Sequence, residues 1–235
     1  MSAIILCIET STIACSVALA KDGEVASLKE DLTGKIHPTL LLPFIDEILK
    51  KEKLNIKQID AIAISKGPGS YTGLRVGVST AKGLCYAIDK PLLAIDTLQA
   101  MAVGMQQIVK NSINHNDLFV PLIDARRMEV YSSVYNTNNE QIREILAEVI
   151  DENSFSEFLK YTRVFFAGDA LSKCKEVLHK KTNAIFIDNF LPSAKWLCPV
   201  AYKLYENKEF ANLAYFEPFY LKDFIAKKSK VKGLM

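Results

Sequence analysis

The chain has 235 residues, of which 49% are hydrophobic, and its formal net charge at pH 7 is +2. This length and composition provide a sizeable core, arranged as one large domain or as two smaller ones. The near-balanced charge argues against a protein that binds nucleic acid through bulk electrostatics, because such proteins carry a basic stripe. One basic run, at residues 227–232, is either a solvated terminus or a segment that touches RNA.

Cysteine usage and the start of the chain argue against several kinds of protein. The five cysteines are scattered without C-x-x-C spacing, which predicts neither a zinc site nor a disulfide framework. The first apolar stretch is broken by Glu9 and has no basic segment before Ile4, so it resembles neither a signal peptide nor a membrane span. We therefore expect no membrane association and a cytoplasmic location.

The chain opens with a predicted meander of three strands, at residues 4–8, 16–20 and 24–29. Asp22-Gly23 is a typical tight hairpin turn between the last two strands. Between the first two strands lies the run Glu9-Thr10-Ser11-Thr12. Its hydroxyls either line a phosphate pocket or form an ordinary polar hairpin loop, and composition alone does not separate the two interpretations.

The first predicted helix begins just after His37, where Pro38 suits the first turn. Its apolar residues cover about 200° of the circumference at 100° per residue, whereas packing on one sheet needs a stripe of roughly 100°. They are Leu40, Leu41, Leu42, Phe44, Ile45, Ile48 and Leu49. The excess apolar arc indicates a second partner, which is either the next helix of this chain or another protein.

A strand, a glycine-rich loop and a helix follow one another over residues 61–88. Residues 61–65 predict a short buried strand, and Ser70 or Thr72 is placed to cap the helix that follows. The loop Lys66-Gly67-Pro68-Gly69-Ser70-Tyr71-Thr72-Gly73 lacks the ending of a Walker A loop and the third glycine of a dinucleotide fingerprint. It is therefore either an anion cradle at a helix start or a tight turn without a ligand.

The helix over residues 72–88 is rich in small residues. Gly73, Gly77 and Gly83 reduce its intrinsic stability, by roughly 1 kcal/mol for each interior glycine. Close approach of another backbone offsets such a cost, because glycine leaves room for it. We therefore expect this helix to pack closely against more than one neighbour.

The second part of the chain begins near Asp96-Thr97, where Thr97 is predicted to cap a helix that runs to Lys110. The aromatic segment at residues 216–221 is expected to dock on the core as a strand or loop. No internal repeat is strong enough to predict. The remaining predicted elements are strands at residues 118–123, 128–135, 164–167 and 185–187, and a helix at residues 195–206.

Charged residues join two of these strands, in the run Asp124-Ala125-Arg126-Arg127. An acid beside two arginines is either a catalytic acid with a phosphate clamp or a structural ion pair. We favour the ion pair, because oppositely charged neighbours in a loop usually pair with each other.

Five runs of the sequence together resemble the TsaB (YeaZ) family, a bacterial component of the machinery that makes N6-threonylcarbamoyladenosine in tRNA. The longest and most specific run is Gly67-Pro68-Gly69-Ser70-Tyr71-Thr72-Gly73-Leu74-Arg75-Val76-Gly77. The others, in the order in which the family has them, are Ile8-Glu9-Thr10-Ser11, His37 leading into Leu41-Leu42-Pro43, Asp124-Ala125-Arg126-Arg127-Met128-Glu129-Val130-Tyr131, and Pro218-Phe219-Tyr220-Leu221. They span nearly the whole chain.

The resemblance implies an α/β protein with the two-domain fold of the actin, Hsp70 and sugar-kinase superfamily (ASKHA, ribonuclease H-like). Residues 1–98 with about 212–235 are expected to form the first domain, and residues 99–211 a second, smaller one. It also implies a non-catalytic scaffold subunit that forms a heterodimer with the catalytic subunit TsaD. A TsaE homologue would be the ATPase partner, tRNA would bind through the complex, and a homodimer is expected when TsaD is absent.

Candidate site residues fall into two groups. The predicted partner face consists of Leu41, Phe44, Ile45, Ile48, Val76, Gly77, Ala81 and Leu84. The candidate nucleotide loops contain Thr10, Ser11, Gly67, Gly69, Ser70 and Thr72. We expect no tightly bound cofactor, with ATP or ADP bound only in the assembled complex. No catalytic residue or metal site is predicted, because the resemblance implies metal binding through a His-x-x-x-His helix in TsaD, whereas Leu41 follows His37 by four residues here.

Two alternative functions stay open. An ATP-dependent phosphotransferase of the sugar-kinase type is favoured by the acidic-Thr-Ser opening and the glycine loops. Against it, Glu9 stands where such enzymes commonly use an aspartate near magnesium. A peptidase is the third hypothesis, but no recognisable nucleophile motif accompanies the three histidines.

Overall fold

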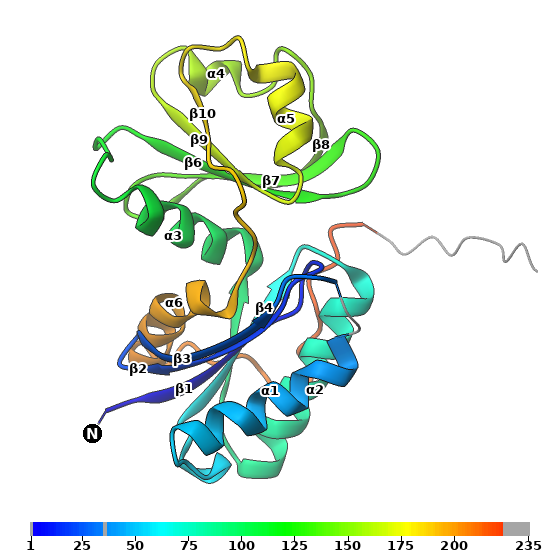
Figure 1. The fold of residues 1–235 in the computed structure, drawn as a ribbon, viewed down its shortest axis with the longest axis vertical. Coiled ribbons are helices and arrows are strands. Elements are labelled where there is room, and N and C mark those ends of the chain that lie inside the picture. Colours follow the sequence, from blue (N-terminus) through cyan, green and yellow to red (C-terminus); the bar gives the residue numbers. More distant parts are fainter. Residues whose placement is uncertain (1, 35–36, 223–235) are drawn as a thin grey trace, which may run out of the picture.

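The computed structural model describes residues 2–34 and 37–222, which form two five-stranded sheets (Figure 1). Sheet A has the strand order β3-β2-β1-β4-β5, and sheet B has the order β10-β9-β6-β7-β8. The strands of sheet A are β1 Ile4–Glu9, β2 Cys15–Lys21, β3 Glu24–Asp31, β4 Ala61–Gly67 and β5 Leu92–Asp96. Those of sheet B are β6 Leu118–Asp124, β7 Glu129–Tyr135, β8 Gln141–Val149, β9 Val164–Gly168 and β10 Ala184–Phe186.

The two sheets have the same topology. In sheet A, β1, β2 and β3 form an antiparallel meander, and β4 and β5 continue the sheet parallel to β1. In sheet B, β6, β7 and β8 form the meander, and β9 and β10 run parallel to β6. The chain therefore consists of two similar halves, although no repeat is visible in its sequence.

Helices cover both sheets. They are α1 His37–Lys51, η1 Ile56–Gln58, α2 Tyr71–Ile88, α3 Thr97–Val109, α4 Ser156–Leu159, α5 Leu171–Leu178 and α6 Ala194–Glu206. Helices α1 and α2 pack on one face of sheet A, and α6 packs on the other. Helix α3 packs on sheet B and lies between the halves, while α4 and α5 cover the far face of sheet B (Figure 1).

Burial of both faces explains why the inner strands of sheet A are mostly apolar. In β1, Leu6 and Ile8 belong to the core under α1 and α2, whereas Ile5 and Cys7 belong to the core under α6. Side chains alternate between the faces of a strand, so a strand covered on both sides has no polar positions. The predicted strands in this region are confirmed, as is the turn at Asp22-Gly23, where both residues have positive φ.

Three details differ from the predictions. Helix α6 packs against sheet A, so the chain returns to the first half well before the predicted residue 212. A local pattern shows that a helix is amphipathic but not which sheet it will cover. Thr97 is the first residue of α3 rather than its cap, since Asp96 occupies the cap position. Strand β8 and helix α4 lie in a stretch for which no element is predicted.

The glycines of α2 have two different surroundings. A Cβ atom on Gly77 would lie 2.2 Å from Thr10 Oγ1 and 3.0 Å from Ile64 Cδ1, so the helix and the loop after β1 are in direct contact there. A Cβ atom on Gly83 would meet nothing within 4 Å. The predicted close approach is confirmed at Gly77, and the approaching element is the chain's own hairpin loop.

These surroundings predict opposite effects for one added methyl group. We expect Gly77→Ala to lower the free energy of unfolding by about 1–3 kcal/mol, because the methyl group overpacks the contact with Thr10. Gly83→Ala should raise it by up to about 1 kcal/mol, because alanine is the better helix former and the space is open. Urea unfolding of both variants measures this, and equal effects would contradict the assigned packing of α2.

Candidate functional site: the cleft between the two halves

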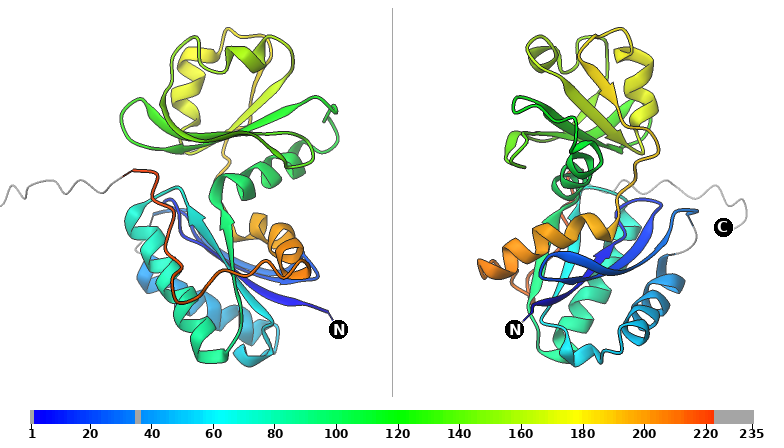
Figure 2. Two further views of the ribbon diagram at one scale, coloured as in Figure 1. Left: turned by 180° about the vertical axis from the view of Figure 1, so that it is seen from behind. Right: turned by 60° about the vertical axis from the view of Figure 1, so that its left-hand side comes forward.

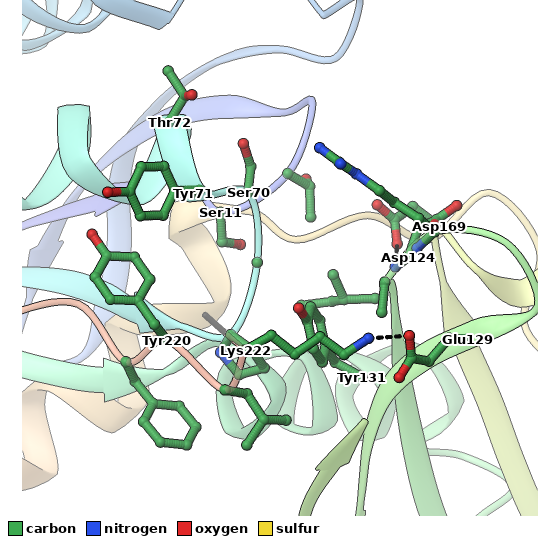
Figure 3. A pocket seen from close by; sticks show the side chains of 18 of the residues that line it. Ser11, Ser70, Tyr71, Thr72, Asp124, Glu129, Tyr131, Asp169, Tyr220 and Lys222 are labelled. Carbon is green, nitrogen blue, oxygen red and sulfur yellow. Dashed lines mark hydrogen bonds and ion pairs between the residues drawn. The ribbon is translucent and has the colours of Figure 1, made fainter. Parts of the chain in front are cut away.

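A cleft of about 800 Å³ lies between the two halves (Figure 3). Its first wall is formed by the loop after β1 and by the loop that leads into α2. Its second wall is formed by the β6–β7 turn and the loop after β9, and residues 219–222 lie along its edge. The lining residues include Ser11, Thr12, Gly69, Ser70, Tyr71, Thr72, Asp124, Arg126, Arg127, Glu129, Tyr131, Asp169, Tyr220 and Lys222.

The two candidate nucleotide loops meet in the first wall. Ser70 N–H donates to the Ser11 carbonyl at 2.6 Å, and Thr10 Oγ1 donates to the Gly73 carbonyl at 2.8 Å. A Cβ atom on Gly69 would lie 2.3 Å from the Ser11 carbonyl oxygen, so only glycine fits there. Ser70 caps α2, since its Oγ accepts the Gly73 N–H at 3.3 Å.

Four of the six nucleotide-loop residues line the cleft, and two do not. Ser11, Gly69, Ser70 and Thr72 are in the lining. Thr10 is buried behind the wall, where it contacts α2. Gly67 is also behind it, with φ 121° and a would-be Cβ 2.5 Å from the Phe219 carbonyl oxygen. Nucleotide binding by this set stays a prediction.

Glu9, the acid next to these loops, is turned into the protein. Its side chain is 1% exposed, and burial raises the pKa of its carboxyl above the ordinary value. One of its carboxylate oxygens accepts the Ser11 N–H at 2.5 Å, which closes the turn after β1. Glu9 therefore shapes the loop and does not line the cleft.

Asp124 occupies the matching position at the end of β6. One of its oxygens accepts the Arg126 N–H at 2.5 Å, the same two-residue turn that Glu9 and Ser11 form. Its ion-pair partner is Lys173 on α5, at 2.9 Å. The predicted ion pair between Asp124 and a neighbouring arginine is therefore wrong, because the lysine of α5 takes the place of the arginine. Arg126 and Arg127 both have positive φ in the tight turn, and both side chains are exposed.

Asp169, in the loop after β9, lines the cleft with a carboxyl whose pKa is shifted by its surroundings. Burial raises the pKa of its carboxyl to about 6, and the neighbouring Asp124 charge acts in the same direction. Its Oδ1 accepts the Asp124 N–H at 2.9 Å, which partly offsets this effect, as does the nearby Lys173 ammonium.

The C-terminal segment crosses from one half to the other. It passes beside α2 (Figure 2), where Lys82 Nζ donates to the Phe216 carbonyl at 2.8 Å. Phe219 N–H then donates to the Lys66 carbonyl at 2.7 Å. The Tyr220 ring lies 4.9 Å from the Tyr71 ring, and Lys222 forms an ion pair with Glu129 of the other half. The predicted docking of residues 216–221 is confirmed. Their position at the edge of the cleft could not be predicted from the sequence.

The predicted partner face is largely occupied by the chain's own core. Leu41, Ile45, Ile48, Gly77 and Ala81 are buried between sheet A and the two helices. Phe44, Val76 and Leu84 are half-buried at the edge of the same core. Packing within the chain thus accounts for most of the surplus apolar arc, and contact of these residues with a partner stays a prediction.

Two of the three carboxylates that line the cleft form ion pairs. Asp124 and Glu129 are engaged in ion pairs with lysines. Within residues 2–34 and 37–222, no cluster of three or more His, Cys, Asp or Glu side chains is placed to hold a metal ion. No helix of that part is long and apolar enough to cross a membrane. The other groups that line the cleft are hydroxyls, the start of α2, two arginines and aromatic rings.

Comparisons with known proteins identify the family of the chain. A family model described as TsaD, tRNA N6-adenosine threonylcarbamoyltransferase, matches residues 31–230. The tRNA threonylcarbamoyladenosine biosynthesis protein TsaB of Haemophilus influenzae is 34% identical, over 93% of both chains. TsaB of Escherichia coli is 30% identical, over 94% of this chain and 96% of its own.

Solved structures confirm the fold. YeaZ from Pseudomonas aeruginosa matches with a TM-score of 0.78 at 26% identity, over 93% of this chain and 100% of its own. The Lmo2764 protein from Listeria monocytogenes, described as a candidate N-acetylmannosamine kinase, matches with a TM-score of 0.50 at 12% identity, over 88% of this chain and 100% of its own. The predicted ASKHA-like architecture is therefore confirmed.

The raised pKa of Asp169 predicts a pH dependence of stability. A carboxyl whose pKa is higher in the folded protein than in the unfolded chain stabilises the fold when protonated, and this contribution is lost as pH rises through about 6. Lowering the pH from 7 to 4 should therefore raise the free energy of unfolding of the unmodified protein by about 2 kcal/mol relative to Asp169→Asn. Urea unfolding across this pH range measures the difference, and parallel curves would show that Asp169 is not perturbed.

Proposed function

The chain belongs to the TsaB family of tRNA threonylcarbamoyladenosine biosynthesis proteins, and from this we propose that it is a non-catalytic subunit that pairs with a TsaD homologue. In this proposal the pair, with a TsaE homologue as ATPase, modifies tRNA, and this chain positions and supports the catalytic subunit. ATP or ADP would bind in the assembled complex. The engaged state of Asp124 and Glu129 supports a role without chemistry of its own.

The observation that carries the proposal is the outer face of α2. Ser79, Gly83 and Ala87 are exposed at intervals of four residues, so they form a strip of small side chains along one face of the helix. Nothing lies within 4 Å of the Cβ position of Gly83. Such a strip allows another helix to approach closely, because no side chain keeps the two backbones apart.

Large exposed side chains are present on both α1 and α2. Tyr86, on α2, is 85% exposed, and Leu42, on α1, is 56% exposed. The half-buried Phe44, Val76 and Leu84 add apolar area where α1 and α2 meet the core. Exposed apolar groups gathered around a close-approach strip are typical of a protein interface. The same surface would serve a homodimer when TsaD is absent.

The proposal predicts that Gly83→Gln prevents assembly. We expect this chain and the TsaD homologue of the same organism to elute together at the summed mass in size exclusion with light scattering. Gly83→Gln should weaken this association at least tenfold, because the new side chain fills the space that the partner helix needs. The fold should be intact, since glutamine is a good helix former and the position is open.

Ser172→Gln, at an exposed position of α5, is the matched control and should assemble normally. Normal assembly of the Gly83→Gln variant would show that the interface lies elsewhere on the molecule. Separate elution of the two unmodified proteins, with and without the TsaE homologue and ATP, would contradict the pairing itself.

A further inference from the structure

The lining of the cleft contains three acidic and three basic side chains. Two of the acids form ion pairs with lysines, Asp124 with Lys173 and Glu129 with Lys222. Arg126 and Arg127, in contrast, are exposed and form no ion pair within the described part of the chain. Their guanidinium groups are therefore available to a negatively charged ligand.

A third arginine lies near the start of α2, one helical turn after the lining residue Tyr71. Arg75 is exposed and donates one hydrogen bond to the Tyr71 hydroxyl at 2.9 Å, so it contacts an aromatic group and not a carboxylate. Its guanidinium carbon lies 5.3 Å from the centre of the Tyr71 ring. Arg75 therefore lies beside an aromatic ring of the cleft without lining the cleft itself.

Aromatic side chains accompany these cations. Phe219 and Tyr220 are each 38% exposed, so part of each ring is accessible to a ligand. The Tyr220 ring is supported from behind by Tyr71, at 4.9 Å between ring centres. Figure 3 shows Tyr71 and Tyr220 on one side of the cleft, with Asp124, Glu129 and Asp169 on the other. Rings on one wall thus face the arginine-bearing turn on the other.

We propose that the mouth of the cleft binds a single-stranded segment of RNA, with a base stacked on Tyr220 and the flanking phosphates bound by Arg126 and Arg127. Proteins recognise unpaired RNA mainly through aromatic stacking and through arginine contacts to phosphate, and both groups are present here. A purely acidic protein partner would not use the exposed rings. The inference rests on the proposed function, in which the substrate of the complex is a tRNA.

Fluorescence anisotropy with the full chain tests this inference. The probes are a labelled RNA hairpin with an unpaired loop of anticodon size, a fully paired RNA duplex of the same length and an acidic peptide. We expect the hairpin to bind more tightly than the duplex. Arg126→Gln/Arg127→Gln should weaken hairpin binding about tenfold and lower the slope of log K against log salt by about 1.4, the value expected for two lost phosphate contacts to a single strand.

Tyr220→Leu should also weaken hairpin binding about tenfold, but it should leave the salt slope unchanged, because stacking is not an ionic contact. The control is Lys180→Gln/Lys203→Gln, which removes the same amount of charge at two exposed positions. Lys180 lies just after α5, and Lys203 lies on α6. It should leave hairpin affinity within about twofold. Thermal unfolding of each variant confirms that it is folded.

Three outcomes would overturn the inference: equal loss of affinity in the lysine control, equal binding of hairpin and duplex, or binding of the acidic peptide with the same dependence on Arg126 and Arg127. The arginine and tyrosine variants should assemble normally with the TsaD homologue, because these residues lie away from Gly83. A variant that loses RNA binding but still assembles therefore tests the cleft alone. Failed assembly of a chain that still binds RNA would contradict only the proposed function.

Discussion

The close contact between the loop after β1 and the start of α2 is the constraint on which the rest of the structure depends. Thr10 Oγ1 donates to the Gly73 carbonyl, and Gly77 leaves no room for even one further carbon beside the same hydroxyl. This contact brings Ser11 and Ser70 into one wall and sets the position of the whole helix. Glycine is required because the two segments approach within the space that a side chain would occupy.

The second half repeats this arrangement with different residues. Asp124 closes its turn on Arg126 as Glu9 does on Ser11, and Gly168 ends β9 with the positive φ that Gly67 has at the end of β4. The two cleft walls are thus structurally related but chemically different. One presents hydroxyls, a helix start and aromatic rings, and the other presents two arginines together with Asp124, Glu129 and Asp169, of which the first two pair with lysines. A ligand between them would meet an aromatic surface on one side and positive charge on the other.

On α1 and α2, the buried and the exposed faces carry different kinds of side chain. Their most apolar side chains, such as Leu41 and Ile48, are used inside the chain, which leaves small residues and a few large exposed ones on the outside. A partner surface on α2 would therefore depend on close backbone approach around Gly83 more than on burial of large aliphatic groups. The cleft and this helix face involve different residues, so the proposed RNA contact and the proposed partner contact do not compete for the same surface.

The sequence by itself determined most of the elements, the family and the parts of the first wall, but not β8 or α4. Strands and helices depend on local periodicity, the turn at Asp22-Gly23 and the cap at Ser70 depend on neighbouring residues, and the run from Gly67 to Gly77 is specific enough to identify the family. Only the tertiary structure decided which sheet α6 covers, that Asp124 pairs with Lys173, and that residues 216–222 close the edge of the cleft. The physical reason is that these contacts join segments that are distant in the chain. An amphipathic pattern indicates that one face of a helix is buried, but not which segment covers it.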